Sequence, residues 1–123
     1  MLRERRIAME KQPLQLIECH VSGATYYINI ASIIYLESQG HYLRIITENA
    51  SYVIRHTLKN FIKNLDAKSF YQIHQSFVIH LKFIESVSHQ EVLLKGDYHV
   101  PIGRKYKESF LTEIHKYLKQ APL

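Results

Sequence analysis

The segment Pro101-Ile-Gly-Arg-Lys-Tyr-Lys107 places three cations at the start of a predicted helix. A helix N-terminus carries partial positive charge, so Arg104, Lys105 and Lys107 are slightly disfavoured there, and Glu108 alone offsets them nearby. A docked anion would reverse this balance, because cations and free backbone N–H groups would then act on it together. The pattern favours phosphate binding. The alternative is a solvated basic turn without a partner.

A second polar cluster interrupts the apolar stretch of residues 70–84. Two periodicities compete in this stretch, because some apolar residues are spaced as on a strand face and others as on a helical stripe. We therefore expect a strand, a tight helical turn and a second strand, with the turn exposing His74, Gln75 and Ser76. All three can hydrogen-bond without a charge, which is the chemistry that reads base edges and phosphates.

The loop Ser38-Gln-Gly-His41 is a third candidate. Gly40 permits a tight turn and leaves His41 at its edge, where the imidazole would be exposed. Histidine in such a place is as often an ordinary surface residue as a ligand contact, so this loop counts only together with the other two.

Metal binding and catalysis find no support in the sequence. The eight histidines include no HExxH motif and no pair at i,i+4, and the single Cys19 has no cysteine partner. There is no GxSxG motif and no glycine-rich phosphate loop, and no third group orients Ser76 beside His74 as in a catalytic triad. We expect no metal, no cofactor and no enzymatic activity.

Length and composition indicate one globular domain. The 123 residues are 46% hydrophobic and 22% charged, which is enough to bury a core. The formal charge of +5 weakly favours an anionic partner such as nucleic acid or a membrane surface. No apolar run is long enough to span a membrane, no secretory signal opens the chain, and the lone cysteine fits a reducing compartment, so a cytoplasmic location is expected.

The elements that must position these turns are mostly strands. Residues 1–13 are predicted to be a charged lead-in or linker remnant, residues 14–118 the domain, and residues 119–123 a tail. A short helix begins after Thr57, a good N-terminal cap, and a second helix spans about 105–118 with Phe110 and Ile114 on its apolar face. The order predicts a mostly β (α+β) domain. Its strands are expected over residues 14–20, 26–30, 33–38, 42–47 and 51–55, within 70–84, and over 84–88, 92–94 and 98–101.

Five segments together resemble the LytTR-type (LytR/AlgR-like) DNA-binding domain of bacterial transcription regulators. They occur in the family's order and spacing and span most of residues 14–118. They are Ile33-Ile-Tyr-Leu-Glu-Ser38, Gly40-His-Tyr42, Tyr52-Val-Ile-Arg-His-Thr-Leu58, Phe70-Tyr-Gln-Ile-His-Gln-Ser-Phe-Val-Ile79 and Pro101-Ile-Gly-Arg-Lys-Tyr106.

The resemblance implies elongated, stacked antiparallel sheets with a short central helix and a C-terminal helix. It also implies that loops, not a recognition helix, enter successive major grooves of a direct-repeat site, with two domains on one face of double-stranded DNA. Carried over by position, the base contacts fall on His41, Gln75 and Arg104. The contacts to the DNA backbone fall on Ser76, Lys105 and Lys107.

The sequence departs from the family pattern at three positions. Gln75 stands where Arg or Asn is usual, so the base preference there is open. His80 stands where Asn is common and Gly103 where a small hydroxyl residue is common, and either change could alter loop shape. The chain carries no receiver domain, so we expect either a regulator controlled by a separate protein or an excised domain.

A different class of function also fits the sequence. The domain could be a protein-interaction module that uses exposed strand edges and tyrosines, with its basic charge serving solubility. Such a module would bind DNA weakly, with strong dependence on salt and no preferred sequence. Homodimer formation on DNA and a separate regulatory protein are the further candidate partners.

Overall fold

Ten strands dominate the computed structural model, which describes residues 15–118. The predicted lead-in over residues 1–13 and tail over 119–123 lie outside this range. No helix within the described range is long and apolar enough to cross a bilayer. The strands are β1 (Leu16–Val21), β2 (Ala24–Asn29), β3 (Ile33–Gln39), β4 (Tyr42–Thr47), β5 (Ser51–Arg55), β6 (Phe70–His74), β7 (Phe77–His80), β8 (Ile84–Val87), β9 (Glu91–Leu94) and β10 (Tyr98–Pro101).

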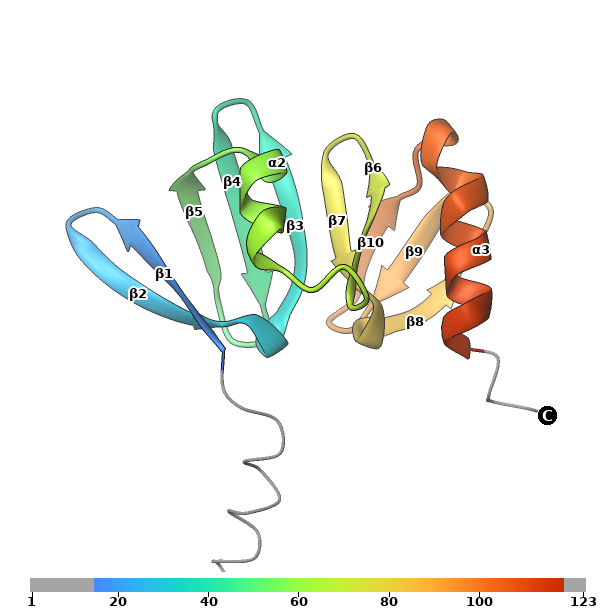
Figure 1. Cartoon of the computed structure of the whole chain (residues 1–123), viewed down its shortest axis with the longest axis horizontal. Helices are drawn as coiled ribbons and strands as arrows, with labels where there is room; N and C mark the ends of the chain where they lie inside the picture. The colour runs from blue at the N-terminus through green and yellow to red at the C-terminus, as the bar shows by residue number, and fades with distance from the viewer. Residues whose placement is uncertain (1–14, 119–123) are drawn as a thin grey trace, which may run out of the picture.

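The strands form three antiparallel sheets arranged in a row (Figure 1). The central sheet has the order β5-β4-β3-β7-β6, the hairpin β1-β2 lies at one end, and the sheet β10-β9-β8 lies toward the other end. Pairing of β3 with β7 is the one contact of the central sheet that joins distant segments, with Tyr35 opposite Ile79. This elongated stack of antiparallel sheets confirms the predicted fold class.

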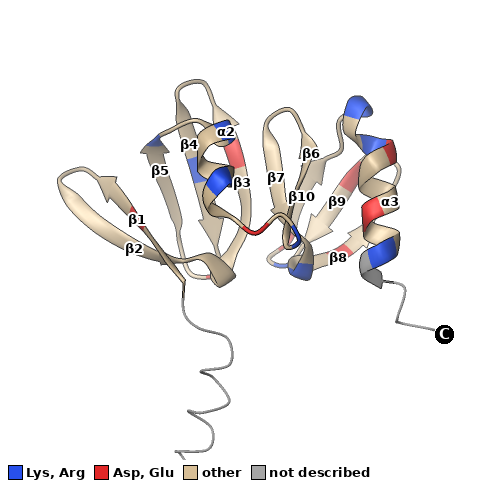
Figure 2. Cartoon of the chain, in the orientation of Figure 1, with Lys and Arg blue, Asp and Glu red and all other residues tan. Residues whose placement is uncertain are grey.

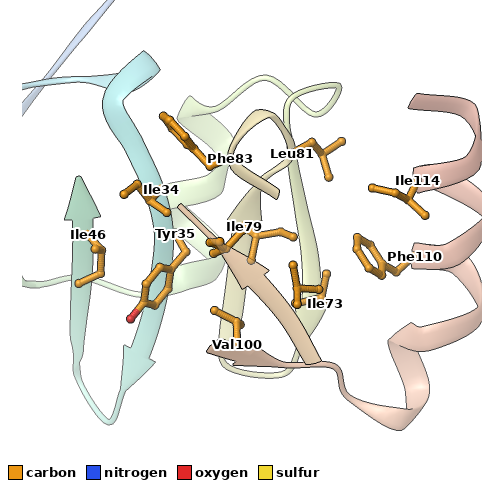
Figure 3. Close-up of a cluster of buried hydrophobic side chains, with 12 residues drawn as sticks. Ile34, Tyr35, Ile46, Ile73, Ile79, Leu81, Phe83, Val100, Phe110 and Ile114 are labelled. Atoms are coloured by element: carbon orange, nitrogen blue, oxygen red, sulfur yellow. The ribbon is translucent and has the colours of Figure 1, made fainter. Parts of the chain in front are cut away.

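Side chains that alternate between the two faces of the central sheet contribute to two hydrophobic cores, one on each face. In β3, Tyr35 enters one core and Leu36 the other, as period-two alternation requires. The first core joins the central sheet to the sheet β10-β9-β8 and to the C-terminal helix (Figure 3). The second is closed by the hairpin β1-β2 and the short central helix. Both faces of the central sheet are therefore packed.

Two helices complete the fold. The short helix α2 (Leu58–Phe61) continues as a 3-10 turn over Ile62–Asn64, and the Thr57 hydroxyl accepts the Asn60 backbone N–H at 3.1 Å, as the capping prediction required. The C-terminal helix α3 (Lys107–Leu118) is preceded by a 3-10 turn over Arg104–Tyr106. It buries Phe110 completely, so its apolar face holds it against the first core.

One local prediction is wrong. The stretch of residues 70–84 has no helical turn in its middle, because β6 and β7 are joined by the two-residue turn Gln75–Ser76. The helical component of the pattern has two other sources. The pairing register shifts between Gln72 and His74, and a 3-10 turn over Leu81–Phe83 follows β7. Both features interrupt strict alternation without forming a helix between the strands.

His80 lies in the core and does not shape a loop. Its Nδ1–H donates to the Ile33 carbonyl oxygen at 2.8 Å, which ties β7 to the start of β3. The ring stacks on Phe70 with centroids 4.2 Å apart and meets Phe83 edge-on at 5.2 Å. Burial lowers the pKa of His80, Lys82 lowers it further, and the hydrogen bond to Ile33 opposes this only in part.

Stability should therefore fall as the solution is acidified. A lowered pKa means that the unfolded chain binds the proton more readily. The contribution of neutral His80 is therefore fully present above its unfolded pKa of about 6.5 and is lost progressively as the pH falls from there through the lower folded pKa. The His80→Asn variant keeps an N–H donor for Ile33 and removes the titration. Urea unfolding at pH 7 and pH 5 should show a smaller pH dependence in the variant. Equal dependence in both proteins would contradict this role of His80.

Candidate nucleic-acid interface

The three turns singled out from the sequence lie at one edge of the molecule (Figure 1). This edge, called here the reading edge, consists of the β3–β4 turn, the β6–β7 turn and the junction between β10 and α3. His41, Gln75 and Arg104, one from each turn, are all exposed. The three candidate base-reading residues are therefore brought together and accessible.

Backbone hydrogen bonds fix the turns relative to one another. The Ser38 N–H donates to the Ser76 carbonyl oxygen at 2.8 Å and joins the first turn to the second. The Gly103 N–H donates to the Ile73 carbonyl oxygen at 2.7 Å and joins the third to the second. The reading edge is thus a continuous, preorganised surface, which lowers the entropic cost of binding a ligand.

The first turn consists of Gly40 and His41, because Gln39 pairs with Tyr42 across it. Gly40 has φ +61°, and a Cβ added there would meet no atom within 4 Å. Glycine is therefore favoured by the backbone conformation and not by crowding. The tightness of the turn leaves the His41 side chain in solvent at the tip.

Two side chains behind the second turn hold its shape. The His74 Nδ1 accepts the Ser76 backbone N–H at 3.0 Å, and the Gln72 amide donates to the carbonyl oxygens of His74 and Gln75 at 3.1 and 3.3 Å. His74 is half-buried and serves the turn, while Gln75 stays exposed. Sequence reasoning grouped His74 with the exposed residues and missed the supporting role of Gln72, since no local pattern marks either bond.

The third turn begins at Gly103, which packs against the end of β6. A Cβ at this position would lie 3.3 Å from His74 Cα and 3.1 Å from the Tyr106 ring, so a larger residue would press the junction away. Glycine also supplies no side-chain cap for the 3-10 turn that follows. An open groove of about 460 Å³ lies beside it, lined by Arg104, Lys107 and the β8–β9 turn among others.

The cations at the start of α3 (Figure 2) lack the carboxylate partners that two cations of the sheets have within residues 15–118. Arg44 and Lys95 are neutralised by Glu37 and Glu48, at 2.9 and 2.8 Å. Within residues 15–118, by contrast, no carboxylate pairs with the cations at the start of α3. Arg104 and Lys105 are exposed, Lys107 is half-buried, and the half-buried Ser76 sits in the neighbouring turn.

The described part of the chain gives little support for metal binding or for a reactive thiol. No three His, Cys, Asp or Glu side chains of residues 15–118 are grouped so that they could hold a metal ion. Cys19 is buried in the second core, and burial raises the pKa of its thiol. That thiol therefore behaves as a core side chain.

Comparison with known proteins agrees with this geometry. Residues 23–115 match the family described as the LytTr DNA-binding domain. Among solved structures, the chain is similar to the LytTr DNA-binding domain of a methyl-accepting/DNA response regulator from Bacillus cereus. The two share 17% sequence identity with a TM-score of 0.72, over 80% of this chain and 95% of that one. No curated protein matches the chain.

The structural likeness shows the fold, and the family match shows kinship over three quarters of the sequence. A domain of this family binds DNA. The exposed edge of hydrogen-bonding and cationic side chains agrees with this match. The chain therefore belongs to the LytTr DNA-binding domain family and is a DNA-binding domain of transcription regulation.

Proposed function

We propose that this domain recognises a specific double-stranded DNA sequence, with its three turns entering successive major grooves of a direct-repeat site. The observation that carries the proposal is the placement of His41, Gln75 and Arg104 on one preorganised, exposed edge. Base edges in the major groove present distinct donor and acceptor patterns, which side chains of these three types can distinguish.

Each of the three residues has a different reading role. The Arg104 guanidinium can donate two hydrogen bonds to a guanine, the commonest specific contact in DNA complexes. The Gln75 amide can form two hydrogen bonds with one adenine. Because it carries no charge, it contributes more to sequence selectivity than to the overall affinity for DNA. The exposed His41 imidazole reads a neighbouring base through one ring nitrogen.

The remaining polar groups bind the DNA backbone. The Ser76 hydroxyl makes no hydrogen bond within the described residues and is free to donate to a phosphate. Lys105 and Lys107 supply charge where the backbone N–H groups of the junction lack a side-chain cap. Two copies of the domain would occupy the two repeats, which makes dimer formation on DNA part of the proposal.

Selection from a random duplex pool at about 0.15 M salt tests this proposal, because non-specific attraction is already weakened at that ionic strength. We expect one enriched sequence, present twice in the same orientation. A protein-interaction module would give no enriched sequence and only salt-sensitive binding. The observation that most favours this alternative is the exposure of Tyr27 on the hairpin β1-β2, whose relative accessibility is 63%.

Removal of one contact to the DNA backbone should lower the affinity and its salt dependence without changing the preferred sequence. Lys107→Ala should lower the slope of log affinity against log salt by about 1, with a similar loss on every sequence, because a phosphate contact carries no sequence information. Lys116→Ala is the matched control, since Lys116 is exposed near the other end of α3, away from the reading edge. Equal slopes for the two variants would remove Lys107 from the interface.

A further inference from the structure

Arg55, the last residue of β5, lies next to the turn that carries His41. It pairs in register with Tyr42, so the two side chains share one face of the sheet. The Arg55 guanidinium carbon lies 5.9 Å from the centre of the Tyr42 ring. Both residues are exposed, and Figure 2 shows the cation at the end of β5, across the β3–β4 turn from those of α3.

The bonding of Arg55 differs from that of its neighbour Arg44. Arg44 lies on the same face and is neutralised by Glu37 at 2.9 Å. Arg55 has neither a carboxylate partner nor a side-chain hydrogen bond within residues 15–118. At this distance the Tyr42 ring is within cation–π range of the guanidinium, and no N–H donor of Arg55 is used within residues 15–118. Planar, charged and unoccupied donors are what a phosphodiester group binds best.

We propose that Arg55, oriented by Tyr42, binds a backbone phosphate of the DNA on the outer side of the His41 turn. This inference rests on the proposed function and deepens it. Phosphate contacts would then flank the base-reading turns at both ends, with Lys105 and Lys107 at one end and Arg55 at the other. Arg55 is the DNA contact, and Tyr42 is a positioning residue.

The test compares Arg55→Ala with Arg44→Ala on the selected duplex. Both changes remove one positive charge from the same face of the sheet, so a general charge effect is common to the two. Loss of a phosphate contact should lower the salt slope by about 0.9, which corresponds to roughly fivefold weaker binding at 0.15 M salt. We expect this change for Arg55→Ala and a clearly smaller one for Arg44→Ala.

Phosphate ethylation interference locates the contact on the DNA. In the wild type, ethylation of one phosphate beyond the base read by His41 should block binding, and this block should disappear in Arg55→Ala. Tyr42→Phe should behave as the wild type because it keeps the ring, whereas Tyr42→Ala should weaken binding. Circular dichroism of each variant checks that it is folded.

The outcomes distinguish failure of the proposed function from failure of the Arg55 contact. If the wild-type protein enriches no sequence, the proposed function fails. If the wild type keeps its site but Arg55→Ala matches Arg44→Ala in salt slope and leaves the interference pattern unchanged, the Arg55 contact alone is overturned.

Discussion

Replacement of Arg104 by Ala is expected to weaken binding to the selected site by roughly 1–3 kcal/mol, or about 5- to 150-fold. The exposed guanidinium stands at the third turn without a carboxylate partner in the described chain, so its donors are available to a guanine. Losing a two-point contact to one base pair should also relax selectivity at that position. The selected consensus of the variant should show all four bases there.

Lys105→Ala provides the comparison for this experiment. Lys105 is exposed, immediately follows Arg104 in the same 3-10 turn and carries the same charge. Its removal should reduce affinity for all sequences by a similar factor and leave the consensus intact. If Arg104→Ala instead weakens selected and random duplexes equally, Arg104 binds the backbone and does not read a base.

Much of the fold was predictable from the sequence, because it follows from local patterns. Period-two alternation located most strands, and Gly40 marked the β3–β4 turn by the backbone conformation that it permits. Thr57 marked the start of α2 through a cap that acts within one helical turn. These signals involve residues a few positions apart, which a single sequence displays directly.

The parts that sequence reasoning missed depend on contacts between distant segments. His80 reaches Ile33 across 47 positions of the chain. Gly103 is constrained by the backbone of His74, and Arg55 lies within cation–π range of Tyr42 on a neighbouring strand. The residues around each of these contact partners in the sequence do not indicate that it makes a long-range contact. The common edge of the three turns likewise follows from the pairing of β3 with β7 and from the hydrogen bond between Gly103 and Ile73, which no local pattern indicates.

The largest loss of stability is expected from Phe110→Ala. Phe110 is fully buried in the first core and lies against Tyr71 of β6, with ring centroids 5.9 Å apart. Truncation of a buried phenylalanine costs about 3–5 kcal/mol, a large part of the stability of a domain of this size. Urea unfolding should show this loss. Thr112→Ala, at an exposed position of α3, should change stability by less than about 0.5 kcal/mol.

The Phe110→Ala variant also tests which contact holds Arg104 in position. The junction before α3 is attached to β6 by the hydrogen bond from Gly103 to Ile73, which Phe110 does not make. Under conditions where the variant is folded, we therefore expect its consensus to be that of the wild type, with affinity reduced only by the unfolded fraction. The milder Phe110→Leu change extends the test if Phe110→Ala does not fold. Loss of selectivity at the Arg104 position alone, in a folded variant, would mean that packing of α3 and not the backbone bond orients the arginine.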